Sequence, residues 1–156
     1  MSEDVTDRFR DIEFETMLLG RHLSPVRRAA DGESYLDRSA YTLLTRLQAQ
    51  GPMSIGQLSE AFGLDASTLN RQTAAMMRSG LVERIPDPDG GLARKFLVTE
   101  AGSKKLDAER ASNVTGLQNV LQDWSPEDVA ALATLLTRFN EVIERREGRS
   151  WPRSRP

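Results

Sequence analysis

The 156-residue sequence contains no cysteine and a single histidine, His22. Without cysteine the chain can form no disulfide, thiolate metal site or thiol redox switch, and a single histidine disfavours a histidine-based metal site. No apolar run has the length of a membrane span, and the charged start MSEDVTDRFR is not followed by the apolar core of a signal peptide. We therefore expect a cytoplasmic protein with no cofactor.

The sequence also lacks the patterns that catalysis requires. It contains no nucleophile paired with a base, no glycine-rich phosphate loop and no metal-ligand spacing, so an enzyme is the least favoured class. The hydrophobic content of 38% and charged content of 28% indicate a soluble globular chain. The formal net charge of −2 disfavours a polycation that coats nucleic acid, but it allows a local basic surface.

Apolar periodicity and turn residues predict a mainly α fold with one β-hairpin. Ser54 and Gln57 match a capping box, Asp65 caps the following helix, and Ser125 with Pro126 begins the last helix. The expected order is four helices, a hairpin and two more helices, at 5–30, 35–50, 54–62, 66–79, 81–99, 99–122 and 125–147.

Long apolar helices at both ends flank the middle of the chain. A middle of about 65 residues does not need so much terminal apolar surface, which favours homodimerisation through the end helices. The alternative is a monomer in which both ends pack on the middle. The basic, proline-containing end GRSWPRSRP, residues 148–156, predicts a flexible tail.

The helix at 66–79 has an unusual outward face. From Ala66 to Val82 the sequence has no Asp or Glu, whereas ordinary solvated helix faces carry both signs of charge. Winding the helix at about 100° per residue puts Met76 and Met77 on an apolar side, which we interpret as core. The opposite side and its flank offer donors and acceptors suited to base edges and phosphates, from Ser67, Thr68, Asn70, Arg71 and Arg78.

A predicted hairpin follows this helix at once, with the turn PDPDGGL and a return strand ARKFLVT. Arg94 and Lys95 lie just past the turn, as in a wing that contacts a neighbouring groove or backbone. Helix-turn-helix spacing alone also occurs in helical bundles without a DNA role, and a lone Arg71 is an ordinary surface residue. The combination of acid-free helix and basic hairpin favours contact with DNA.

These motifs resemble the MarR family of winged helix-turn-helix transcriptional regulators. The resemblance covers roughly residues 34–147 and is strongest in GPMSIGQLSEAFGLDASTLNRQTAAMMRSGLVERIPDPDG and FLVTEAG. It implies a single domain over 1–156, with a winged lobe at 34–100 and dimerisation helices at 5–30 and 101–147. It further implies a homodimer on a pseudo-palindromic double-stranded operator, acting as a repressor that a small, often aromatic, ligand releases.

The resemblance places Ser67, Thr68, Asn70 and Arg71 at the family's recognition-helix contact positions, with Asp65 as the cap. The wing departs from the family pattern, which usually runs Asp-x-Arg at the tip. Here those positions are 90–92, Gly-Gly-Leu. Either Arg94 reaches the groove from a shifted register, or wing contact is weakened. The two glycines also suggest a mobile tip.

Candidates for lining a ligand pocket are aromatic, Met and His side chains of the first two helices, although each is also an ordinary interior residue. They are Phe14, Met17, His22, Tyr35 and Tyr41. The sequence thus predicts a dimeric, ligand-responsive DNA-binding regulator. The alternative is a winged helix that binds another protein without binding DNA, which the missing tip arginine favours.

Overall fold

The computed structural model describes residues 3–22 and 36–153. The chain divides into two compact units, Met1–Arg38 and Ser39–Pro156, and each is described by itself. In the first unit α1 spans Glu3–His22 and carries exposed apolar side chains, among them Phe9 and Ile12. The helix expected at 5–30 is therefore present as far as His22, and its remainder lies outside the described residues.

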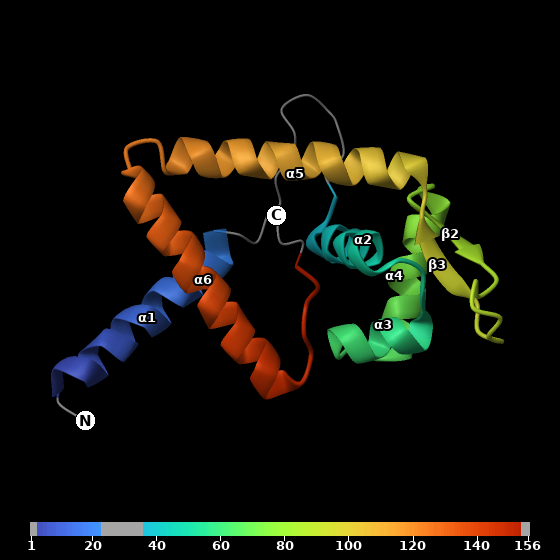
Figure 1. Ribbon diagram of the computed structural model, residues 1–156, viewed down its shortest axis with the longest axis horizontal. Coiled ribbons are helices and arrows are strands. Elements are labelled where there is room, and N and C mark those ends of the chain that lie inside the picture. Colours follow the sequence, from blue (N-terminus) through green and yellow to red (C-terminus); the bar gives the residue numbers. More distant parts are fainter. Residues whose placement is uncertain (1–2, 23–35, 154–156) are drawn as a thin grey trace. The chain divides into compact units, whose positions relative to one another are not determined.

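The second unit is mainly helical with a small antiparallel sheet, which confirms the predicted fold class (Figure 1). Its elements are α2 (Arg38–Gln50), β1 (Met53–Ser54), α3 (Ile55–Phe62), α4 (Ala66–Arg78), β2 (Val82–Ile85), β3 (Lys95–Val98), α5 (Glu100–Val120) and α6 (Pro126–Glu147). The predicted helix order holds, with boundaries shifted by a few residues.

The sheet has three strands in the order β1-β3-β2, where the sequence predicted only a hairpin. β2 pairs with β3 so that Val82 faces Val98 and Ile85 faces Lys95, which leaves residues 86–94 as the wing loop. The unpredicted strand β1 is two residues long and places Met53 opposite Phe96. It therefore joins the start of the helix-turn-helix to the wing.

Side-chain caps fix the helix starts as the sequence predicted. The Ser54 hydroxyl accepts from the Gln57 N–H while the Gln57 side chain accepts from the Ser54 N–H, which is a complete capping box at α3. The Ser125 hydroxyl accepts from the Asp128 N–H at the start of α6, where Pro126 is the first residue. These bonds satisfy backbone donors that a helix start leaves unpaired.

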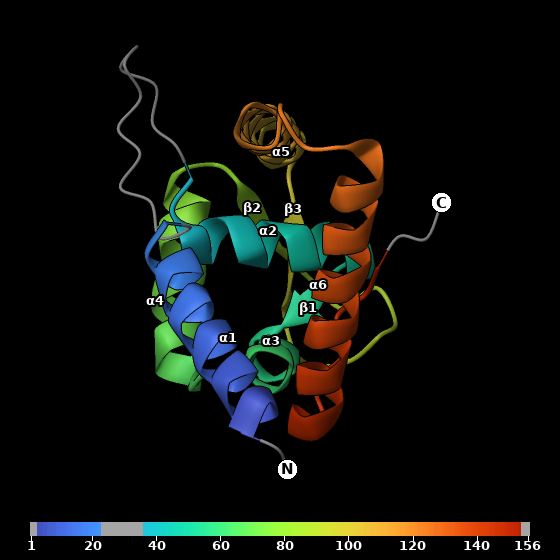
Figure 2. The same ribbon diagram turned by 90° about the vertical axis from the view of Figure 1, so that its left-hand side faces the viewer.

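The core lies where α2, α3 and α4 meet the sheet and the first turns of α5, and Figure 2 shows α2 crossing this region. Its fully buried side chains include Leu43, Leu44, Met53, Leu58, Leu69, Thr73 and Leu106. Thr73 satisfies its hydroxyl by donating to the Leu69 carbonyl at 2.7 Å. Met76 is buried as expected, but Met77 is 41% exposed and the interpretation of it as core is wrong. Met77 lies at the edge of the apolar arc, where the described residues leave it partly exposed.

Helices α5 and α6 extend from the lobe with much apolar surface uncovered. None of the residues of α6 is buried, although a stripe of large apolar side chains runs along it, made of Val129, Leu132, Leu135, Leu136, Phe139 and Ile143. Among the described residues, no helix combines the length and apolarity that crossing a membrane requires. After α6, residues 149–153 make specific contacts with α6 and with the lobe. The flexibility expected at 148–156 stays a prediction, and residues 154–156 lie outside the described residues.

Candidate nucleic-acid interface

The start of α4 is organised by the carboxylate of Asp65. It accepts the Thr68 N–H at 2.7 Å, and it also accepts the hydroxyls of Ser67 and Thr68. These hydrogen bonds, led by that from Ser67, lower the pKa of Asp65 to about 2, so the carboxylate is ionised at neutral pH. The expected cap is confirmed, and it fixes both hydroxyls expected to contact DNA.

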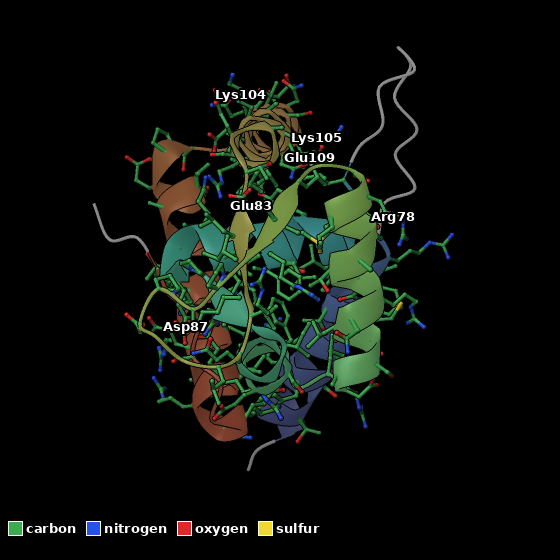
Figure 3. All side chains as sticks on the ribbon, turned by 90° about the vertical axis from the view of Figure 1, so that its right-hand side faces the viewer. Arg78, Glu83, Asp87, Lys104, Lys105 and Glu109 are labelled. Carbon is green, nitrogen blue, oxygen red and sulfur yellow. The ribbon has the colours of Figure 1, made fainter. Side chains whose placement is uncertain are left out.

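The outward face of α4 carries exposed side chains with free donors. Asn70, Arg71 and Arg78 are exposed. Within the described part of the chain, neither arginine has a hydrogen-bond or ion-pair partner. Figure 3 shows Arg78 at the end of α4, directed away from the lobe. Two unpaired guanidinium groups on an acid-free helix make this face locally positive on a chain whose net charge is −2.

The turn before α4 holds this helix at a fixed angle to α3. Gly63 ends α3 with a φ of 63°, a left-handed conformation that glycine adopts readily. The Ser59 hydroxyl donates to the Leu64 carbonyl at 2.6 Å across the turn. Leu58 and Leu69, one on each helix, are fully buried. The predicted helix-turn-helix spacing therefore corresponds to a packed pair of helices.

Lys95 lies inside the wing. Its ammonium is 3.0 Å from the Asp87 carboxylate and 3.8 Å from that of Asp89, and its side chain is only 11% exposed. The Asp89 N–H also donates to Asp87, and this bond, followed by that from Lys95, lowers the pKa of the Asp87 carboxyl. The placement of Lys95 differs from the DNA contact expected of it, because two carboxylates already take up its charge.

The two glycines of the wing loop have specific structural roles. Gly90 has a φ of 82°, and a Cβ on Gly91 would lie 2.3 Å from an Asp87 carboxylate oxygen. Glycine is needed at the first position for its backbone conformation and at the second for a close approach, so a mobile tip is not required to explain them. Leu92 is fully exposed, and Arg94 is exposed with no partner among the described residues.

A tight contact joins the wing to α5 and explains the VTEAG motif. The Thr99 hydroxyl accepts from the Gly102 N–H at 3.0 Å and donates to the Gly80 carbonyl. The Thr99 N–H donates to the Leu81 carbonyl at 3.1 Å. A Cβ on Gly102 would lie only 2.1 Å from the Leu81 carbonyl oxygen. The glycine lets the start of α5 rest on the backbone that enters the wing.

The candidates for ligand binding do not all lie in one unit of the structure. Phe14, Met17 and His22 lie on α1 in the first unit, and Phe14 and Met17 are about half exposed. Tyr41 is half-buried on α2 in the second unit, and Tyr35 lies outside the described residues. Their common pocket stays a prediction. Across residues 3–22 and 36–153, no three acidic or histidine side chains are grouped as metal ligands.

Comparison with known proteins identifies this arrangement. The sequence model of the MarR family matches residues 36–90. The HTH-type transcriptional regulator YxaD of Bacillus subtilis (strain 168) is 32% identical over 132 residues, which cover 85% of this chain and 92% of YxaD. The chain belongs to the MarR family.

Solved MarR-type structures have the same fold. A MarR family protein from Bacillus stearothermophilus superposes with a TM-score of 0.67 at 21% identity, over 92% of this chain and 98% of that one. The transcriptional regulator SlyA gives a TM-score of 0.69 at 22% identity, over 88% and 97% of the two chains. This MarR family member is therefore a DNA-binding transcriptional regulator and not an enzyme, and the alternative of a module that binds only protein is set aside.

Proposed function

We propose that this MarR family member is a cytoplasmic homodimeric repressor, which binds a pseudo-palindromic operator and is released by a small aromatic ligand. The observation that carries the proposal is the exposed, acid-free face of α4 with its unpaired Arg71 and Arg78. A two-fold dimer presents two such helices, which matches two half-sites on one face of a duplex.

Each α4 would enter a major groove with its N-terminal part. Arg71 has the fork of donors that reads guanine edges or holds a phosphate, and Asn70 suits adenine. Ser67 and Thr68, fixed by Asp65, are short enough to let the helix approach closely. Arg78, at the far end of α4, would contact the phosphate backbone.

The wing would contact DNA through Arg94. Arg94 is exposed and unpaired within the described residues, whereas Lys95 is held by Asp87 and Asp89. Of the two expected wing contacts we therefore retain Arg94 and assign Lys95 to the hairpin itself. One phosphate contact per wing would make a modest contribution to affinity, about one counterion released per contact.

The dimer would form through the apolar stripe of α6, aided by α1. Leu135 is 60% exposed and Phe139 48% exposed, and such a stripe on a 22-residue helix is typical of a surface that is covered in an assembly. Leu135→Asp should dissociate the dimer in sedimentation velocity. Thr134→Asp introduces the same charge on the side of α6 that faces away from the centre of the apolar stripe. This variant should leave the dimer intact.

The ligand would be a small aromatic molecule bound by some of the candidate side chains named from the sequence. Phe14, Met17 and Tyr41, with His22 and Tyr35, offer apolar surface and a few polar groups, which suit such a molecule. Salicylate is a simple probe, and it should shift the emission of the tryptophans or weaken operator binding. If a panel of such probes does neither, release by an aromatic ligand is refuted while DNA binding is not.

A gel-shift assay on the DNA upstream of the protein's own gene tests the central proposal. We expect a specific complex that weakens steeply as salt is raised, because phosphate contacts release counterions. Arg71→Ala should lower the affinity by about 1–3 kcal/mol if Arg71 reads a base. Arg138→Ala on α6 removes an equal charge and should have little effect. The absence of specific retention at both low and moderate salt would refute the operator assignment.

A further inference from the structure

The chain reverses direction after α6 and is fixed back onto it. Gly148 has a φ of 68°, and the Arg149 N–H donates to the Glu144 carbonyl at 3.0 Å. The Glu144 carboxylate then accepts from the Trp151 N–H at 3.1 Å and from both terminal nitrogens of Arg153. These contacts, with Arg153 first, lower the pKa of the Glu144 carboxyl. One carboxylate thus accepts three hydrogen bonds, one from the Trp151 backbone and two from the Arg153 side chain.

The same segment contacts the lobe through Trp151. Its ring meets the ring of Phe62 edge to face, with centroids 5.4 Å apart and planes at 88°. The guanidinium of Arg46 lies 5.1 Å from the centroid of Trp151 and donates to the Ser150 carbonyl at 2.9 Å. Arg46 is 8% exposed, and its Nε donates to the Gln50 side-chain oxygen at 2.8 Å. Removal of the segment would leave a buried cation with fewer partners, which is costly.

These contacts converge on the turn of the helix-turn-helix. Phe62 is the last residue of α3, and Gly63 follows it. A Cβ on Gly63 would lie 2.7 Å from the guanidinium carbon of Arg149, so the Arg149 side chain lies directly on this turn. α4 begins at Ala66, three residues further on. Figure 1 shows the segment after α6 running toward the lobe.

We propose that residues 149–153, which we name the C-terminal strap, position the recognition helix by fixing the turn before α4 to the end of α6. Trp151 and Arg149 are the positioning residues. The strap connects α6 to the DNA-reading helix by a short path that does not pass through the wing or α5. The inference rests on the proposed operator binding, since it is that affinity which the strap supports.

The effect of the strap on the position of α4 can be measured as a change in operator affinity. Trp151→Ala loses the aromatic contact and the cation–π contact, and we expect operator affinity to fall about tenfold. Trp151→Phe retains the ring and should recover most of this loss. Trp124→Phe is the matched control, because it alters the other tryptophan at the start of α6, and its affinity should equal that of the wild type. Equal affinity of Trp151→Ala and the wild type would overturn the proposal.

Docking of the strap can be measured without DNA, which separates this inference from the operator assignment. In the Trp124→Phe background Trp151 is the only tryptophan, and its emission should be blue-shifted and protected from acrylamide in the free protein. Arg46→Met should remove that protection. An exposed, freely quenched Trp151 in the folded protein refutes the strap even if the operator is found, whereas a docked Trp151 with no operator binding refutes only the proposed function.

A milder variant distinguishes a loss of positioning from unfolding of the lobe. Arg149→Ala removes an exposed side chain on the turn, so the fold should be retained. Faster amide hydrogen exchange at residues 63–65, with a lower operator affinity and an unchanged salt slope, supports positioning. A salt slope lower by about one would instead identify Arg149 as a phosphate contact. Unchanged exchange and affinity in Arg149→Ala, should Trp151→Ala fail to fold, would also overturn the proposal.

Discussion

The contact between Gly102 and the Leu81 carbonyl predicts an unusual response to alanine. In most helices Gly→Ala is stabilising, by up to about 1 kcal/mol, because alanine has the higher helix propensity. At Gly102 the added Cβ would lie 2.1 Å from the carbonyl oxygen and 2.9 Å from its carbon. Both atoms belong to the backbone, so neither can move aside by a change of rotamer.

The sign of the effect follows from comparing the two contributions. Overpacking of this kind costs about 1–3 kcal/mol, and the hydrogen bond from the Thr99 N–H to the same carbonyl, at 3.1 Å, would be distorted, adding about 1 kcal/mol. After subtraction of the propensity gain, we expect Gly102→Ala to lower the free energy of unfolding by about 1–3 kcal/mol. Because the same contact positions the wing, operator affinity should fall as well.

Urea unfolding at a fixed chain concentration, followed by circular dichroism, measures this difference. Gly56→Ala is the matched control, since a Cβ on Gly56 in α3 would meet only the Ser54 hydroxyl oxygen, at an ordinary 3.8 Å. It should be neutral or stabilising by up to about 1 kcal/mol. If Gly102→Ala is as stable as Gly56→Ala, the tight contact does not constrain the fold and the reasoning fails.

Three further predictions concern the caps and the wing. Ser54→Ala removes one half of the capping box and should cost about 1 kcal/mol of unfolding free energy in the same urea assay. Carbon NMR should give Asp65 a pKa of about 2, and Ser67→Ala should raise it. Because the pKa of Asp65 in the folded protein lies below its ordinary 3.8, the ionised carboxylate stabilises the fold above about pH 4. This stabilisation is lost as the pH falls through 2. Arg94→Ala should lower the slope of log affinity against log salt by about 0.9, whereas Lys95→Met should leave the slope unchanged and destabilise the hairpin.

Local chemistry explains why so much of the lobe could be predicted from the sequence. The caps at Ser54 and Asp65 and the left-handed Gly63 depend on residues within a few positions of one another. The periodicity of α4 likewise predicted the burial of Met76, although Met77 is exposed. The same periodicity predicts which residues of α4 are exposed, and the candidate DNA-contact residues lie on that exposed face.

The features that were missed depend on contacts between distant parts of the chain. β1 is too short to have a pattern of its own and exists because Met53 pairs with Phe96. The docking of residues 149–153 depends on Arg46, which bonds to a residue 104 positions away. Lys95 was expected on the surface because its charge is visible in the sequence, while its burial between carboxylates depends on how the wing loop closes.

The cap at the start of α4 also determines whether the hydroxyls of Ser67 and Thr68 can donate or accept further hydrogen bonds. An ionised carboxylate can only accept, so the bonds that join Asp65 to Ser67 and Thr68 must use the hydroxyl protons. The hydroxyl oxygens then have only lone pairs to offer. In a major groove, lone pairs match the exocyclic amino groups of adenine and cytosine and are repelled by guanine O6 and thymine O4. If Ser67 and Thr68 face a major groove, as we propose, their hydroxyls can accept hydrogen bonds from only two of the four bases, because the Asp65 carboxylate holds their protons.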